Sequence, residues 1–86
     1  MKITEVKLAL ANQGTIRAFA TITVDNCLAI HDLRIIEGPK GLFVAMPSKL
    51  KDGTYRDIVH PVNAETRETI ERTLLAEYKK VAARNS

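Results

Sequence analysis

The sequence has no tryptophan and only two phenylalanines and two tyrosines among its 86 residues. Because 45% of the residues are hydrophobic, the core must be built almost entirely from aliphatic side chains. A chain of this length fits a single domain, which we expect to span residues 1–86, and it buries only about 60–65% of its unfolded surface. Self-association would add buried surface to so thin a core.

Cysteine is equally scarce, and Cys27 has no second cysteine with which to form a disulfide within the chain. This favours a reducing cytoplasm, because small secreted domains usually carry several disulfides. No cation flanks Cys27 in VDNCLAI, so we expect a small buried apolar residue rather than a reactive thiol. Charged residues interrupt residues 1–14, which argues against the apolar run of a signal peptide. No segment approaches the ~20 apolar residues of a membrane span, so we expect no contact with a membrane.

The net charge of +3 is modest, but the charges are unevenly distributed. Residues 1–37 hold four cations and four anions, whereas residues 38–60 hold four cations and two anions. Such a local excess of positive charge favours contact with a polyanion, although many proteins without such a partner show a similar bias.

Alternation of apolar and polar residues predicts strands in the first two thirds of the chain. The clearest is 16–24, in which Phe19 faces away from the apolar side. Polar Asp25-Asn26 predicts a hairpin turn, and a change of phase at His31-Asp32 predicts a β-bulge. The predicted strands cover residues 3–10, 16–24, 27–36, 42–46 and 55–59.

The pattern changes to a helical period after Asn63, which is a favourable N-cap. Ile70, Leu74, Tyr78 and Val81 form one apolar stripe, which predicts a helix over about residues 64–83. The predicted fold class is α+β, with a four- to five-stranded antiparallel sheet between about residues 3 and 59 and one long C-terminal helix. One helix covers one sheet face, so we expect a strand edge or the other face to pair in a homodimer.

The residue types of a hydrolytic site are present, but their arrangement is not that of a known motif. Ser48, His31, His60, Asp32 and Asp57 supply a nucleophile, imidazoles and carboxylates, yet MPSKL lacks the G-x-S-x-G nucleophile elbow. The two histidines are separated by 28 intervening residues and show no metal-ligand spacing. We therefore predict no catalysis, no metal, no cofactor and no small-molecule substrate.

Basic residues surround the predicted turn at Asp52-Gly53. Lys49, Lys51 and Arg56 flank this turn, and Arg56 carries a planar fork able to read a guanine edge. The segment favours a nucleic-acid contact, with Tyr55 either stacking on an unpaired base or packing on the sheet. A solvated turn that binds nothing remains the alternative.

Several segments of the sequence resemble those of the SpoVG family, named after the bacterial stage V sporulation protein G. These segments are ITEVKL, IHDLRII (30–36), GLFVAMPSK (41–49) and DGTYRDIVHPVNAETR (52–67). The resemblance implies a small regulator of septation, sporulation and gene expression that binds DNA and, in some members, RNA. It also implies an antiparallel sheet with a C-terminal helix, paired through strands into a homodimer.

The resemblance also implies that DNA is bound chiefly through basic residues that follow the Met-Pro-Ser motif and that lie near the helix. This places Lys49 in the expected site, with Lys51 and Arg56 in the same segment. Many members have arginine where this chain has Leu50, so the resemblance implies phosphate affinity more firmly than sequence preference. We predict a homodimeric, cytoplasmic nucleic-acid-binding regulator; the alternative is a protein-interaction adaptor that uses an exposed sheet edge.

Overall fold

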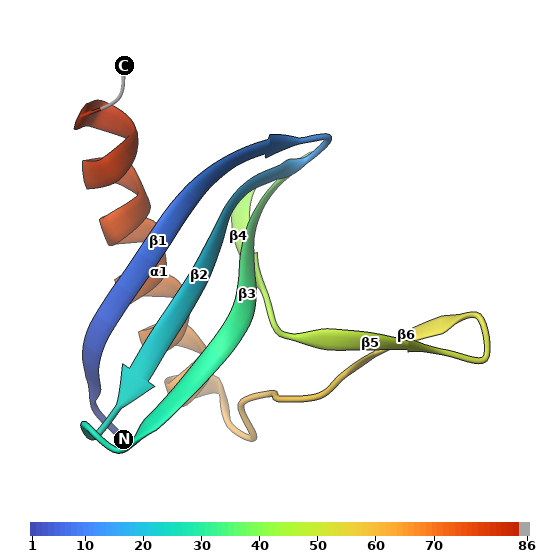
Figure 1. Cartoon of the computed structure of the whole chain (residues 1–86), viewed down its shortest axis with the longest axis horizontal. Coiled ribbons are helices and arrows are strands. Elements are labelled where there is room, and N and C mark those ends of the chain that lie inside the picture. Colours follow the sequence, from blue (N-terminus) through green and yellow to red (C-terminus); the bar gives the residue numbers. More distant parts are fainter. Residues whose placement is uncertain (85–86) are drawn as a thin grey trace.

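A computed structural model describes residues 1–84 of the chain (Figure 1). Within these residues, six strands precede a single helix. The elements are β1 (Ile3–Gln13), β2 (Ile16–Val24), β3 (Leu28–Gly38), β4 (Gly41–Ala45), β5 (Ser48–Lys51), β6 (Thr54–Asp57) and α1 (Ala64–Arg84). No helix within residues 1–84 is long and apolar enough to cross a membrane.

The strands form two sheets rather than one. β1, β2, β3 and β4 are antiparallel neighbours in chain order, whereas β5 and β6 pair only with each other. The α+β class, the antiparallel sheet and the C-terminal helix are confirmed, but the predicted last strand at 55–59 runs from Thr54 to Asp57 and lies outside the main sheet. Pro47 has no N–H to donate, so the ladder of β4 ends before it and the chain leaves the sheet.

Two hairpins reverse direction through two consecutive residues with left-handed backbone. Asp25 and Asn26 have φ of 49° and 54°, and Asp52 and Gly53 have φ of 52° and 78°, the signature of type I′ turns. In the first turn the Cys27 amide donates to the Val24 carbonyl at 3.0 Å. Cys27 is exposed there, so the expectation of a buried cysteine was wrong; a turn at the sheet end holds its side chain outside the core.

The predicted bulge at His31-Asp32 is confirmed. Ala20 pairs with Leu33 but Ile22 pairs with Ile30, so two residues of β3 oppose Thr21 of β2. Asp32 has a φ of 64°, which moves the alternation of β3 by one residue and returns Leu33 to the buried face.

The core is aliphatic, as composition predicts. It lies between one face of the four-stranded sheet and α1, which packs against β1 and β4. Buried side chains come from alternate positions of β2 and β3, from β4 and the residue that follows it, and from the helix. They are Ala18, Ala20, Ile22, Val24, Leu33, Ile35, Val44, Met46, Ile70 and Leu74.

The helix begins where the sequence predicts. The Oδ1 atom of Asn63 accepts a hydrogen bond from the Thr66 amide at 2.8 Å, which satisfies one of the free N–H groups of the first turn. Ile70 and Leu74 are buried, and Tyr78 packs against the core from the same stripe. The cap thus fixes the start of α1, and the apolar stripe fixes the side that faces the sheet.

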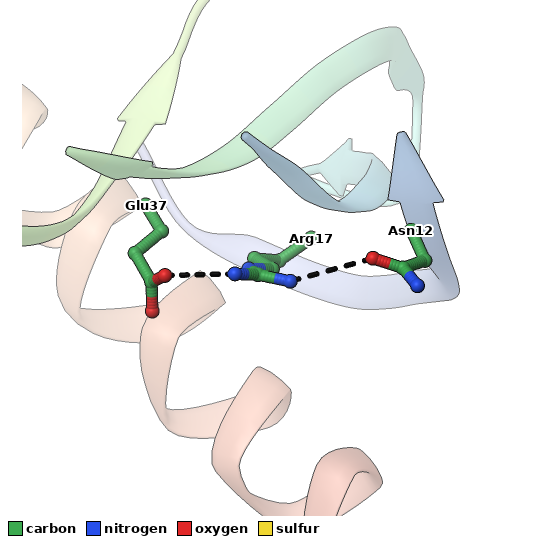
Figure 2. A network of polar contacts seen from close by, with 3 residues as sticks. All are labelled: Asn12, Arg17 and Glu37. Atoms are coloured by element: carbon green, nitrogen blue, oxygen red, sulfur yellow. Dashed lines mark hydrogen bonds and ion pairs between the residues drawn. The ribbon is translucent and has the colours of Figure 1, made fainter. Parts of the chain in front are cut away.

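A polar network joins β1, β2 and β3 at one end of the four-stranded sheet (Figure 2). Arg17 donates from Nη2 to Glu37 Oε2 at 2.8 Å and from Nη1 to Asn12 Oδ1 at 3.4 Å. The hydrogen bond and the negative charge of Glu37 raise the pKa of Arg17 above its ordinary value. The guanidinium therefore stays charged and joins β1, β2 and β3 at this end of the sheet.

The opposite face of the sheet is left open by α1, which lies behind the strands in Figure 1. On this face Phe19 of β2 stands beside Ala9 of β1 and Arg34 of β3, and Phe43 of β4, 43% exposed, stands beside Ile36. The prediction that Phe19 faces away from the core is confirmed, and the monomer leaves apolar surface uncovered here.

Candidate nucleic-acid interface

The hairpin of β5 and β6 extends away from both the sheet and the helix (Figure 1). We call this segment, residues 48–57, the ribbon. Every ribbon residue except half-buried Ser48 is exposed. A two-stranded hairpin with no packed face is marginally stable by itself, so its position depends on how its base is held.

Three hydrogen bonds hold the base of the ribbon. The Ile58 amide donates to the Pro47 carbonyl at 2.7 Å and so closes the two strands where they leave the body. Arg34 of β3 donates from Nη2 to the Met46 carbonyl and to Ser48 Oγ, both at 3.1 Å. A charged donor on the rigid sheet thereby fixes the first residue of β5.

The cross-strand register gathers the three predicted cations on one face of the ribbon. Lys49 lies directly opposite Arg56, and Lys51 lies opposite Thr54. Because side chains alternate along a strand, Lys49, Lys51 and Arg56 project from the same face. The sequence predicted these cations around one turn; the structure adds that they share one face.

Within residues 1–84, no carboxylate forms an ion pair with this basic face. Asp57 lies opposite Ser48 and so belongs to the other face, while Asp52 is in the turn at the tip. Within residues 1–84 the ion pair joins Arg17 to Glu37, and none of the three ribbon cations has a carboxylate oxygen within 4.0 Å. Like charges directly opposite each other destabilise a hairpin, so the Lys49–Arg56 pair is an arrangement that a bound anion would stabilise.

The other face of the ribbon carries an apolar pair beyond Ser48 and Asp57. Leu50 and Tyr55 form a cross-strand pair there and are 55% and 71% exposed. Tyr55 therefore points away from the cations and does not pack on the four-stranded sheet. Position 50 also belongs to this face, so Leu50 does not interrupt the basic face, and an arginine at 50 would project away from Lys49.

The residues considered for hydrolysis are engaged in separate local contacts. Ser48 Oγ accepts from Arg34, His31 Nδ1 lies 3.2 Å from Thr21 Oγ1, and His60 Nδ1 lies 3.3 Å from the Pro61 carbonyl. Among residues 1–84 no hydrogen bond joins Ser48 to either histidine. The described chain also contains no cluster of three or more His, Cys, Asp or Glu that could hold a metal ion.

Sequence reasoning missed Arg34, which positions the ribbon. The available signal was a single cation inside the apolar run Leu33-Arg-Ile-Ile36, on the face opposite the buried Leu33 and Ile35. A charged residue at such a position needs hydrogen-bond acceptors, and the chain supplies them twelve and fourteen residues later.

Comparison with known proteins decides the family. A family model described as SpoVG matches residues 1–80. The chain belongs to the SpoVG family. Three similar proteins, each named "Putative septation protein SpoVG", come from Anaeromyxobacter sp. (strain Fw109-5), Bdellovibrio bacteriovorus and Phytoplasma australiense.

The SpoVG relatives align over most of their length. The Anaeromyxobacter protein is 54% identical over 91% of this chain and 81% of its own length. The Bdellovibrio protein is 52% identical over 93% and 75%, and the Phytoplasma protein is 51% identical over 94% and 86%, respectively. The resemblance read from the sequence is confirmed, and the names of these relatives describe a septation protein.

Proposed function

We propose that the protein is a cytoplasmic, nucleic-acid-binding regulator linked to septation. It binds DNA, and also RNA, through the basic face of the ribbon. The observation that carries the proposal is the grouping of Lys49, Lys51 and Arg56 on one exposed face without a carboxylate. Membership of the SpoVG family supports the regulatory part.

The shape of the ribbon suits the major groove of duplex DNA. That groove is about 12 Å wide and admits a two-stranded β-ribbon. Lysine ammonium groups bind phosphates as point charges, whereas Arg56 can donate two parallel hydrogen bonds to a guanine. Arg56 is therefore the residue that we propose for base readout, with Lys49 and Lys51 fixing the ribbon on the phosphate backbone.

Replacing all three cations tests this assignment. We expect Lys49→Ala, Lys51→Ala and Arg56→Ala together to weaken binding to a fluorescent 20-base-pair duplex by about tenfold or more, measured by anisotropy, because three phosphate or base contacts are lost. The matched control replaces Lys2, Lys40 and Arg72, which are exposed residues of the same types and charge. Equal affinities of the two triple variants would refute the ribbon assignment.

We also propose that the protein is a homodimer paired through strands of the ribbon. Both β5 and β6 are edge strands, and the Leu50–Tyr55 pair is exposed in a single chain. A second copy would pair a free edge and cover this apolar pair while leaving the basic face outside. The dimer would present two basic faces to one nucleic acid.

Sedimentation at micromolar concentration measures the oligomeric state. We expect about twice the chain mass of 9.6 kDa for the unmodified protein, and a shift towards the monomer for Leu50→Ser with Tyr55→Ser. Val62→Ser is the control, because Val62 is 86% exposed but lies outside the ribbon. A monomer at all concentrations would overturn the dimer.

The second candidate function is a protein-interaction adaptor. The observation in its favour is the exposed Leu50–Tyr55 pair on the unpaired edge strands of the ribbon, with Ile58, directly after β6, also 64% exposed. An adaptor would keep its activity in the triple alanine variant of the cations and lose it in the Leu50→Ser, Tyr55→Ser variant. The nucleic-acid-binding regulator would show the loss in the cation variant.

A further inference from the structure

The open face of the four-stranded sheet contains a hollow of about 240 Å³ at the bulge of β3. Phe19, Lys7 and Thr21 line it from β2 and β1, and His31 and Asp32 line it from β3. Lys7 pairs with Thr21 across β1 and β2, and the two bulge residues oppose Thr21 from the other side. The polar groups therefore cross three strands in one row beside the ring of Phe19.

The bulge determines which groups face this hollow. Asp32 occupies the left-handed region at φ 64°, where the bulge places it and which aspartate adopts more readily than most non-glycine residues. The hydrogen bond between His31 Nδ1 and Thr21 Oγ1, at 3.2 Å, orients the imidazole. Neither His31 nor Asp32 has a role at the ribbon, and both are exposed.

The chemistry of the lining matches an unpaired nucleotide. An aromatic side chain offers a stacking surface for any base, and the Lys7 ammonium offers a contact for phosphate. An ionised carboxylate only accepts hydrogen bonds. Guanine is the base whose Watson–Crick edge presents two adjacent N–H donors, N1–H and N2–H, to such an acceptor.

The size and position of the hollow agree with a single base. Its volume is below the roughly 300–1,000 Å³ of pockets for drug-sized ligands, and it opens on a sheet surface. The Watson–Crick edge is exposed only in unpaired nucleic acid, because in a duplex it faces the complementary base. A base in this hollow would therefore have to come from a single strand.

We propose that the hollow binds an unpaired guanine nucleotide of a single strand, with the base stacked on Phe19, its N–H edge donating to Asp32 and its phosphate contacting Lys7. This inference rests on the proposed function, since it adds a site for unpaired bases to a protein that holds the nucleic-acid backbone through the ribbon. The ribbon contacts the nucleic acid through its cations, and the hollow adds a preference for an unpaired guanine.

Free nucleotides test the hollow independently of the ribbon. We expect GMP to shift the backbone amide resonances of Thr21, His31 and Asp32 in a ¹⁵N-labelled protein, and AMP, CMP and UMP to shift them at least about fivefold less at equal concentration. Asp32→Asn should weaken the GMP response by about tenfold, because an amide donor replaces one acceptor oxygen. The matched control is Asp25→Asn, which makes the same change at another exposed left-handed position.

Three results would overturn the proposal. They are an unchanged GMP response in Asp32→Asn, equal responses to all four nucleotides, and a changed sedimentation mass in Asp32→Asn, which would make this face an interface between copies. The triple alanine variant of the ribbon should keep the GMP response while losing affinity for oligonucleotides. If that variant bound oligonucleotides normally, the proposed function would fail without affecting the GMP result.

Discussion

Arg34 links the sheet to the ribbon, although it lies outside the basic face itself. Its guanidinium stands on the open face of β3 and donates to both the last residue before Pro47 and the first residue of β5. Two of the three hydrogen bonds that hold the base of the ribbon therefore come from one half-buried side chain.

Replacing Arg34 should loosen the ribbon. We expect Arg34→Ala to lower the free energy of unfolding by about 1–3 kcal/mol, because two charge-assisted hydrogen bonds are lost. Urea denaturation measures the loss, and hydrogen exchange should show the ribbon amides exchanging faster while those of β2 stay protected. Arg34→Lys is the conservative variant, and it should recover part of the stability, since it keeps the charge but loses the planar fork. Unchanged ribbon exchange in Arg34→Ala would refute this role.

At the residue scale, the sequence predicted which residues form the candidate site better than it predicted how those residues are arranged. Lys49, Lys51 and Arg56 could be selected as candidates because they flank an Asp-Gly turn. Their common face depends on the register of β5 against β6, which the type I′ turn sets, and β5 was not predicted as a strand. The contribution of Arg34 was beyond sequence reasoning, since its acceptors lie across a contact between distant segments.

The elements of the fold follow local signals where those signals are strong. The helix begins at its predicted cap, the bulge occurs at the predicted change of phase, and the 25–26 turn forms although it contains no glycine. The separate sheet could not be predicted in the same way. SKLK and TYRD alternate but bury almost nothing, so no hydrophobic pattern distinguishes a free ribbon from an extra strand of the main sheet.

The cap of α1 gives a prediction at the scale of an element. Asn63→Ala should destabilise the protein by about 1 kcal/mol, because the Thr66 amide loses its acceptor. Asn63→Asp should stay close to the unmodified protein, since a carboxylate caps equally well and faces the positive end of the helix dipole. Thermal or urea denaturation measures both variants. Equal stability of Asn63→Ala and the unmodified protein would show that this cap does not contribute.

At the scale of the whole molecule, three surfaces serve three proposed purposes. The helix and one sheet face bury the core, the ribbon presents cations on one side and an apolar pair on the other, and the open sheet face holds the hollow. The thin aliphatic core was predictable from composition, whereas the division of surfaces depends on the ribbon leaving the sheet at Pro47. The homodimer and the nucleic-acid contact stay predictions that this division supports.

The central claim is that the basic face of the ribbon contacts nucleic acid, and the salt dependence of binding tests it most directly. Each phosphate neutralised on duplex DNA contributes about 0.9 to the slope of log K against log salt. Changing Lys49, Lys51 and Arg56 to alanine should therefore reduce the slope by about 2–3 per protomer, whereas the variant of Lys2, Lys40 and Arg72 should keep the original slope. Identical slopes for the unmodified protein and the ribbon variant would contradict the account.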